Sequence, residues 1–168
     1  MTHDRDAVDA ITAQWALVRP GLDVSPIEVI GRISRLSRLF ERALKDYFAQ
    51  HDLESWEFDV LATLRRSGEA CELTVGGLLS QALVTSGAMT NRIDRLEAKG
   101  LVERRADPAD RRTVRIRLTA KGLETVDTVL EGHMANEERL LAPLASAERR
   151  QLVAMLRKLS IAFGDVAP

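Results

Sequence analysis

Apolar residues recur at spacings of three and four positions along most of this chain, the pattern of helices that bury one face. This pattern predicts helices at residues 4–18, 25–50, 56–66, 72–82, 85–99, 120–142 and 146–163. Residues 114–118 depart from it, because apolar and charged side chains alternate there with the period of a half-buried strand. The sequence therefore predicts a mainly α fold with one small β-hairpin.

The helix predicted at residues 85–99 carries a polar face suited to binding DNA. Thr85 or Ser86 can accept backbone N–H bonds at its start, and Gly100 can end it in a left-handed conformation. Its apolar stripe consists of Met89, Ile93 and Leu96. The side chains left outside, which can bond to base edges and phosphates, are Ser86, Thr90, Asn91, Arg95 and Lys99.

A hairpin is predicted directly after this helix. Residues 107–110 read Asp-Pro-Ala-Asp, which is strong turn chemistry, and the strand that follows alternates apolar residues with Arg115 and Arg117. Helix and basic hairpin together form the outline of a winged helix-turn-helix, with Arg111, Arg112 and Arg115 as further candidates to bind DNA. The alternative is an ordinary helix and hairpin with solvated arginines.

The charge distribution favours the DNA-binding interpretation. Residues 85–118 hold nine Lys/Arg and five Asp/Glu, a net charge of +4, whereas the whole chain has a net charge of −1 and the remainder therefore −5. A basic segment on an acidic body is expected of a protein that neutralises phosphates.

The terminal helices carry more apolar surface than one winged domain can cover. The simplest burial is against a second copy, and a twofold dimer would hold two recognition helices about 34 Å apart, one turn of DNA. We therefore expect a homodimer with three parts: residues 1–52 with the N-terminal helices for dimerisation, 53–119 with the winged helix-turn-helix, and 120–168 with the C-terminal dimerisation helices.

Composition argues against several other classes of protein. No apolar run approaches the ~20 residues that span a bilayer, and no signal peptide precedes the first helix, so we expect a cytoplasmic protein without a membrane partner. With one cysteine, Cys71, and three scattered histidines, we expect no disulfide, no metal and no cofactor. No phosphate-binding loop indicates an enzyme. A helical protein-interaction module remains an alternative, but it would explain neither the basic segment nor the hairpin.

Residues 56–122 resemble the MarR family of bacterial transcription regulators. The family's wing pattern stands here as Asp110-Arg111-Arg112, then Ile116-Arg117-Leu118-Thr119, then Gly122. The resemblance implies a homodimer that binds double-stranded DNA at a pseudo-palindromic operator. It further implies that the recognition helices enter major grooves, that Arg112 at each wing tip enters a minor groove, and that Asp110 orients Arg112. Repression is the mode of regulation that the family implies.

A narrower resemblance, to the urate-responsive members of this family, spans nearly the whole chain. The matching segments are an N-terminal helix with Ala13-Gln14-Trp15, Ser25-Pro26, Trp-Glu-Phe-Asp-Val-Leu at residues 56–61, and the run from Ser86 to Leu96. Matched by motif, the ligand residues are Trp15, Asp59, Arg92 and Arg104, so the resemblance implies that residues 1–52 form part of the ligand pocket. An indole could stack on a planar purine, and the arginines supply counter-charges.

The same residues also have structural interpretations. Trp15 could anchor its helix in the core, and Asp59 with Arg92 could form an ion pair that fixes the recognition helix. The two interpretations are compatible, because an anion that competes for the arginines could shift this helix and release the operator. Within the same family, a response to phenolic or other ligands, or to oxidation of Cys71, is the alternative.

Overall fold

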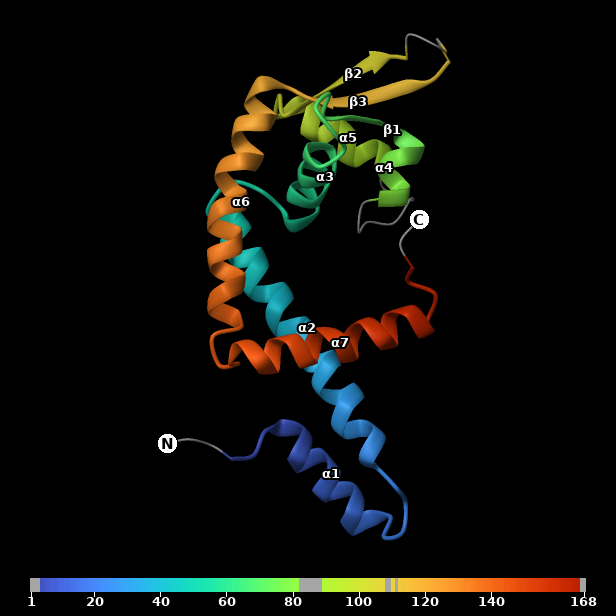
Figure 1. The fold of residues 1–168 in the computed structure, drawn as a ribbon, viewed down its shortest axis with the longest axis vertical. Helices are drawn as coiled ribbons and strands as arrows, with labels where there is room; N and C mark the ends of the chain where they lie inside the picture. Colours follow the sequence, from blue (N-terminus) through green and yellow to red (C-terminus); the bar gives the residue numbers. More distant parts are fainter. Residues whose placement is uncertain (1–3, 82–88, 108–109, 111, 167–168) are drawn as a thin grey trace. The chain divides into compact units, whose positions relative to one another are not determined.

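The computed structural model describes residues 4–81, 89–107, 110 and 112–166 of the 168-residue chain. The chain forms two compact units, Met1–Asp46 and Tyr47–Pro168. The C-terminal helices belong to the same unit as the winged domain. The three functional parts expected from the sequence stay a prediction. Figure 1 shows the helices and strands of both units.

The first unit contains two helices, α1 (Ala7–Val18) and α2 (Ser25–Ala49), the second of which ends in the other unit. Both helices were predicted from the apolar pattern. The side chain of Asp6 starts α1 by accepting the N–H of Val8 at 2.7 Å and that of Asp9 at 3.1 Å. At the start of α2 the carboxylate of Asp23, rather than the predicted Ser25, supplies the cap by accepting the Ser25 N–H at 2.9 Å.

An arginine joins the two helices of the first unit. Arg32 in α2 donates to Asp6 through Nε and to Asp9 through Nη2, each over 2.7 Å. Next to this pair, Val8 is buried, and a Cβ built on Gly31 would lie 3.3 Å from its Cγ1. Charge and close packing therefore both hold the first turns of α1 against α2.

The second unit is a winged helix-turn-helix with two further helices. Its elements are α3 (Ser55–Arg65), β1 (Glu72–Thr74), α4 (Val75–Gln81), α5 (Met89–Ala98), β2 (Val102–Ala106), β3 (Val114–Leu118), α6 (Ala120–Leu140) and α7 (Ser146–Ala162).

A small antiparallel sheet in the order β1-β3-β2 supports the helices (Figure 1). The predicted hairpin is confirmed, with Arg104 opposite Ile116 and Val102 opposite Leu118. The prediction of one helix at residues 72–82 is wrong at its start, because Glu72–Thr74 pairs with β3 and places Leu73 opposite Ile116. The helix begins only at Val75, where Thr74 caps it by accepting the Gly77 N–H at 3.0 Å.

The core of the second unit is formed by apolar residues from all its layers. Its fully buried large side chains include Val60, Leu61 and Leu64 from α3, Leu78 from α4, Met89, Ile93 and Leu96 from α5, Ile116 from β3 and Val126 from α6. The stripe predicted for the recognition helix is thus confirmed. It fixes which face of α5 points away from the core.

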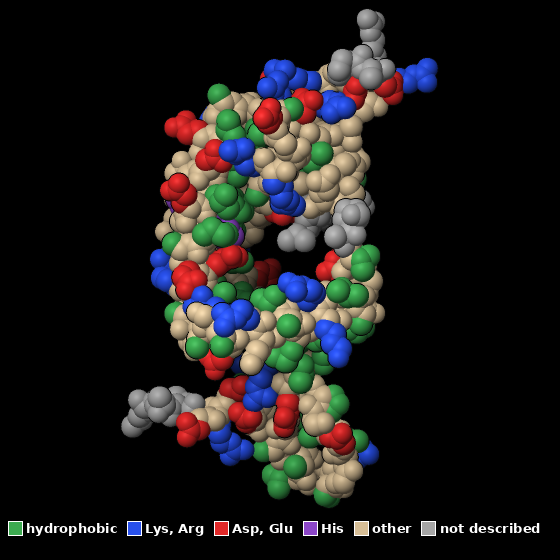
Figure 2. All heavy atoms as spheres, in the orientation of Figure 1, with side chains coloured by type: hydrophobic (Ala, Val, Ile, Leu, Met, Phe, Trp, Pro, Cys, Tyr) green, Lys and Arg blue, Asp and Glu red, His purple; other side chains and the backbone are tan. Residues whose placement is uncertain are grey.

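Several helices, α2, α6 and α7 among them, leave large apolar side chains exposed. On α2 these are Val29, Ile30, Ile33, Leu36 and Leu39; on α6, Leu123, Leu130 and Met134; on α7, Val153, Met155, Leu156, Leu159, Ile161 and Phe163. No described residue of α7 is buried, and green apolar side chains are visible along this helix in Figure 2. Since water-exposed apolar stripes of this extent are unfavourable, a partner surface is needed to cover them.

Candidate nucleic-acid interface

The recognition helix α5 separates its apolar and polar residues by face. Met89, Ile93 and Leu96 are buried, and this leaves Thr90, Asn91 and Arg95 exposed, as the sequence predicts for residues that bind DNA. Ser86, the fourth candidate, lies outside the described residues. The described part of α5 can therefore present two short polar side chains for base edges and one long cation.

The fifth candidate on this helix, Lys99, has its ammonium group turned inward. Its Nζ donates to Oε2 of Glu57 over 2.8 Å and to the carbonyl oxygen of Asp52 over 2.7 Å. Glu57 is 0% exposed, and the same oxygen accepts the N–H of Glu54 at 2.9 Å. The structure thus places Lys99 in a link between α5 and the first turn of α3, and a contact to DNA by this residue stays a prediction.

Glu57 also caps the start of α3, where the sequence predicted a different cap. The sequence favoured Ser55 as the N-cap, but the helix starts after Glu54, whose N–H is bound by the side chain of Glu57.

Gly100 follows the recognition helix, has a φ of 71° and ends α5 as predicted. The N–H groups of Gly100 and Leu101 return to the carbonyl oxygens of Glu97 at 2.8 Å and Leu96 at 3.0 Å.

An indole ring lies under two cations of the recognition helix. The guanidinium carbons of Arg92 and Arg95 lie 5.2 and 5.0 Å from the centre of the Trp56 ring, within the range of cation–π attraction. Arg92 also has a buried Nη1 without a hydrogen-bond partner among the described residues. The ion pair between Arg92 and Asp59 that the sequence suggested does not occur among those residues; Asp59 has interactions of its own.

A further arginine ties the wing to the recognition helix. Arg104 in β2 forms ion pairs with Asp94 and Glu97, both on α5. Burial lowers the pKa of Arg104, but hydrogen bonds to Asp94 and Glu97 outweigh this effect and raise its pKa above the ordinary value. The guanidinium group therefore stays charged while it connects β2 to α5.

The turn of the wing is organised by two aspartates. Asp110 accepts the backbone N–H of Arg112 at 2.9 Å and the hydroxyl of Thr113 at 3.0 Å, so it fixes the backbone that carries Arg112. The side chain of Arg112 is exposed, whereas Arg111 lies outside the described residues. Arg115, also predicted to bind DNA, donates to the buried Asp107 over 2.6 Å and lies 3.5 Å from Glu72, and its contact to DNA stays a prediction.

These pairings change the picture of the basic segment. Arg105 is also paired, with Glu103 at 2.7 Å, so ion pairs within the chain neutralise much of the positive charge counted from the sequence. Figure 2 shows the resulting mixture of blue and red side chains over the hairpin. Among the described residues of this segment, the cations without an ion pair are Arg92, Arg95, Arg112 and Arg117.

The four residues predicted to bind a ligand are distributed over both units. Trp15 lies on α1 of the first unit with 43% of its surface exposed, so within that unit it does not have the core role considered from the sequence. Asp59, Arg92 and Arg104 belong to the second unit. Of these, Arg92 offers an N–H group that no described residue binds, and Arg104 offers a cation already held by two carboxylates.

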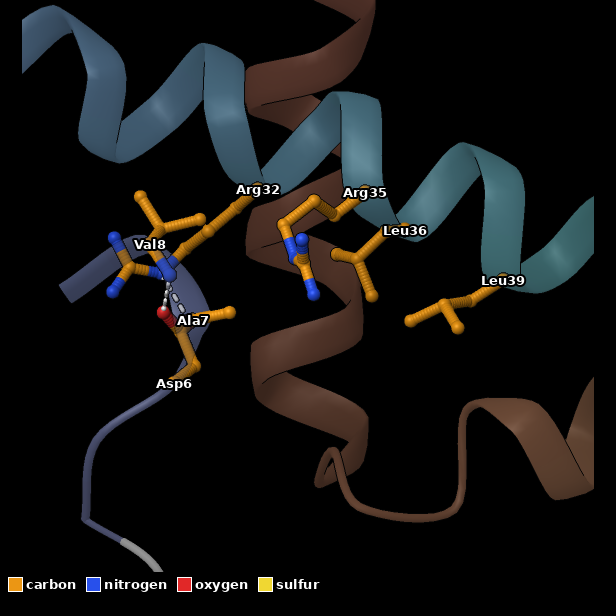
Figure 3. A pocket seen from close by; sticks show the side chains of 7 residues that line it. All are labelled: Asp6, Ala7, Val8, Arg32, Arg35, Leu36 and Leu39. Carbon is orange, nitrogen blue, oxygen red and sulfur yellow. Dashed lines mark hydrogen bonds and ion pairs between the residues drawn. The ribbon is translucent and has the colours of Figure 1, made fainter. Parts of the chain in front are cut away.

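A hollow of ≈ 250 Å³ lies between α1 and α2 inside the first unit (Figure 3). Its walls combine the Asp6–Arg32 ion pair with Arg35 and the apolar side chains of Val8, Leu36 and Leu39. Trp15 is not among the residues that line it. The hollow was not predicted from the sequence, because its lining residues come from two helices whose packing the apolar pattern does not specify.

Other kinds of site receive no support from the described part of the chain. Its His, Cys, Asp and Glu residues form no group of three or more that could hold a metal ion. No helix within the described ranges is long and apolar enough to cross a membrane. Cys71 is buried, and its Sγ lies near the carbonyl oxygens of Gly68 at 3.5 Å and Arg65 at 3.9 Å.

Sequence reasoning missed Glu57 and Trp56 as residues that organise this surface. A charged residue within the apolar run of residues 56–61 was a usable indication, because a buried carboxylate requires a partner. The sequence indicated Asp59 for this reason, but Glu57 is the acid that is fully buried. No sequence spacing indicated that Trp56 would lie against α5, which is about 36 residues away along the chain.

Helix order, sheet and exposed polar face together define a winged helix-turn-helix protein of the kind that binds DNA. A sequence model described as MarR family matches residues 51–113. The chain is also 40% identical over 149 residues to the HTH-type transcriptional regulator PecS of Dickeya dadantii (strain 3937), covering 89% of this chain and 90% of that protein. The chain belongs to the MarR family and is a transcription regulator rather than an enzyme.

Solved structures agree with this assignment. A mutant of MarR from E. coli complexed with operator DNA superposes with a TM-score of 0.69 at 26% identity, covering 86% of this chain and 96% of that one. BpsR of Bordetella bronchiseptica, whose DNA binding is regulated by 6-hydroxynicotinic acid, gives a TM-score of 0.70 at 26% identity, covering 79% and 92%. The winged fold predicted from the sequence is confirmed.

Proposed function

We propose that two copies of this chain repress transcription from an operator and that a small planar anion, urate or a similar compound, releases them. The observation that carries the ligand response is Arg92, a cation on the recognition helix with a buried and unused N–H group. An anion bound there would act directly on the helix that contacts DNA.

Binding of DNA is divided between the helix and the wing in this proposal. Thr90 and Asn91, both short, polar and exposed, bind base edges in the major groove, and Arg95 binds a phosphate or a guanine. Arg112, held at its backbone by Asp110, enters the minor groove. Ser86 and Arg111 are proposed as further contacts from the sequence resemblance alone.

A twofold dimer supplies the second recognition helix and wing. The exposed apolar side chains of α6 and α7 are the surface for it, because removing apolar area from water favours association. A symmetric dimer would also match a pseudo-palindromic operator. The comparison with MarR bound to operator DNA supports this arrangement.

The proposed release depends on Arg104 as well as Arg92. Arg104 is bound to Asp94 and Glu97 of α5, so an anion that takes Arg104 must break the link between wing and recognition helix. Trp15 is proposed to stack on the ring of the ligand, and Asp59 to accept its hydrogen bonds. The relative BpsR responds to an aromatic acid, which supports the same chemical class here.

The energetic requirement is a difference in ligand affinity between the free and DNA-bound states. Each tenfold loss of operator affinity needs about 1.4 kcal/mol of such coupling. Fluorescence anisotropy with the DNA upstream of the protein's own gene, at low salt, should show binding that urate weakens at least tenfold. A benzoate titration at equal concentration separates a response to planar purines from a response to any aromatic acid.

Calorimetry tests the assignment of the site. The variant Arg92→Ala with Trp15→Ala should lose urate binding, whereas Arg65→Ala, which removes an arginine paired with Asp127 at 2.7 Å, should keep it. Equal urate affinity in the wild type and the double variant would remove these residues from the site. Unchanged operator affinity at saturating urate would refute the release.

A further inference from the structure

The Trp56 ring contacts the guanidinium group of Arg95 through the ring face, so the contact uses none of the arginine's N–H donors. A guanidinium group carries five N–H donors at its edge, in one plane, and a carboxylate that pairs with it occupies some of them. Arg104 and Arg115 are bound in that way. The guanidinium of Arg95 lies 5.0 Å from the centre of the Trp56 ring instead, so its edge and its charge remain available for a nucleic acid.

The ring itself is firmly placed. Trp56 is half-buried in the first turn of α3, and the next residue, Glu57, is tied to the N–H of Glu54 and to Lys99 at the end of α5. Arg92, Arg95 and Lys99 follow one another at spacings of three and four, so they lie along one side of α5, facing this turn. Trp56 therefore contacts Arg92 and Arg95, and the next residue, Glu57, contacts Lys99.

We infer that Trp56 is a positioning residue for DNA recognition: its indole ring holds the Arg95 side chain in the conformation that meets DNA. A free arginine loses side-chain entropy when it is immobilised on a phosphate or base. When the side chain already packs on a ring in the free protein, part of this entropy is lost before DNA binds, and less is lost on binding. Arg92 does not serve in the same way, because its Nη1 is buried, whereas Arg95 is exposed. The inference rests on the proposed contact between Arg95 and DNA.

A double-mutant cycle on operator affinity tests it, with Trp56→Leu, Arg95→Gln and both together. We expect Trp56→Leu alone to weaken binding roughly two- to fivefold for each recognition helix. In the Arg95→Gln background it should have no further effect on operator affinity, because the cation that remains over the ring, Arg92, has a buried Nη1 and is not the proposed contact to DNA. Trp56→Phe should keep most of the affinity, since a smaller ring still offers a face. Thr90→Ala, exposed on the same helix, is the matched control and should combine additively with Trp56→Leu.

The mutant cycle distinguishes a contact between Arg95 and DNA from a positioning role of Trp56. If Arg95→Gln leaves operator affinity unchanged, Arg95 does not contact DNA, and the role of Trp56 is refuted with it. If Arg95→Gln weakens binding and Trp56→Leu adds its full effect on top, the contact to DNA stands and the positioning role alone is overturned.

A spectroscopic measurement does not depend on the folding of the Trp56 variants. The chain has two tryptophans, so Trp15→Phe leaves Trp56 as the single source of indole emission. Without ligand, Arg95→Gln in this background should make Trp56 more accessible to the quencher acrylamide, because an exposed side chain over the ring has been shortened. Identical quenching with and without Arg95 would show that the contact does not persist in solution and would overturn the inference.

Discussion

The ammonium group of Lys99 lies 2.8 Å from a carboxylate of Glu57 that is completely shielded from water. This ion pair joins the end of the recognition helix to the start of α3. A carboxylate buried at that depth is costly unless a cation and hydrogen bonds compensate it. The pair therefore fixes the position of α5 and constrains Lys99.

Replacing Lys99 with Met should destabilise the fold by about 2–3 kcal/mol. This value is below the ~3–5 kcal/mol lost when a fully buried pair is broken, because the Lys99 side chain is about one-third exposed. Adding Glu57→Gln should restore part of the loss, since the uncompensated charge is then gone. Urea unfolding measures both. A Lys99→Met protein with the wild-type midpoint would show that the ion pair contributes nothing to stability.

Gly122 should not tolerate a side chain. A Cβ built on it would lie 1.9 Å from the carbonyl oxygen of Leu101, an atom that also accepts the N–H of Thr119 at 3.1 Å and so cannot move freely. We expect Gly122→Ala to lower the free energy of unfolding by about 2–4 kcal/mol. The control is Gly76→Ala in α4, where an added Cβ would meet no atom within 4 Å apart from its chain neighbours and its own helix backbone, and the thermal midpoint of this variant should be unchanged or higher.

Arg112 is the exposed cation of the wing, and its removal should change the salt dependence of DNA binding. Each phosphate contact contributes ~0.9 to the slope of log affinity against log salt, so Arg112→Ala should flatten the slope by roughly that amount for each wing. Arg65→Ala serves as control, because Arg65 is already paired with Asp127 at 2.7 Å. An unchanged slope with Arg112→Ala would mean that the wing does not touch phosphates.

Asn91 should determine sequence preference more than overall affinity. An exposed amide on the recognition helix can bind the edge of one base, and the loss of such a contact costs ~1–3 kcal/mol of discrimination. Asn91→Ala should therefore weaken operator binding at least fivefold while binding to random DNA stays within twofold. Competition with unrelated duplexes measures the ratio, and equal losses on both DNAs would contradict base recognition.

The attachment of α1 should depend on pH in the acid range. Desolvation raises the pKa of Asp6, but hydrogen bonds from the N–H groups of Asp9 and Val8 and from Arg32 outweigh it, and its pKa falls below the ordinary value of 3.8. A carboxylate with a lowered pKa stabilises the fold above its ordinary pKa and loses this contribution as pH falls through the lowered value. Hydrogen-exchange protection of α1 should therefore fall below pH 3.8 in the wild type.

The Asp6→Asn variant supplies the test of that cause. The hydrogen-exchange protection of α1 should be weaker in this variant at neutral pH. Acidification should not lower it further through position 6, because the asparagine has no carboxylate to protonate. Asp4→Asn, which changes an exposed aspartate next to the helix, is the control and should follow the wild type. An acid transition of full size in Asp6→Asn would assign the effect to other carboxylates.

Helices, hairpin and the faces of the recognition helix were predictable because each depends on local chemistry. The positions of Met89, Ile93 and Leu96 alone specify which side of α5 is buried, and a glycine at position 100 suits the left-handed end of the helix. The strand Glu72–Thr74 was missed because three residues carry no periodicity. Only its pairing with β3, more than 40 residues away, makes it a strand.

The roles of individual cations could not be predicted in the same way. Lys99, Arg104 and Arg115 have similar patterns in the sequence to Arg95 and Arg112, all of them charged residues on polar faces. Their partners Glu57, Asp94 and Asp107 come from other elements or from the turn, so only the packed structure shows that these three are neutralised.

The sequence by itself determined the class of fold, the recognition helix with its buried stripe, and the turn of the wing, because short-range spacing and backbone preferences suffice for them. Tertiary structure decided which charges remain for DNA and where the indole of Trp56 lies. Burial, ion pairing and ring contacts depend on distances between segments far apart in the chain, and no local pattern specifies those distances.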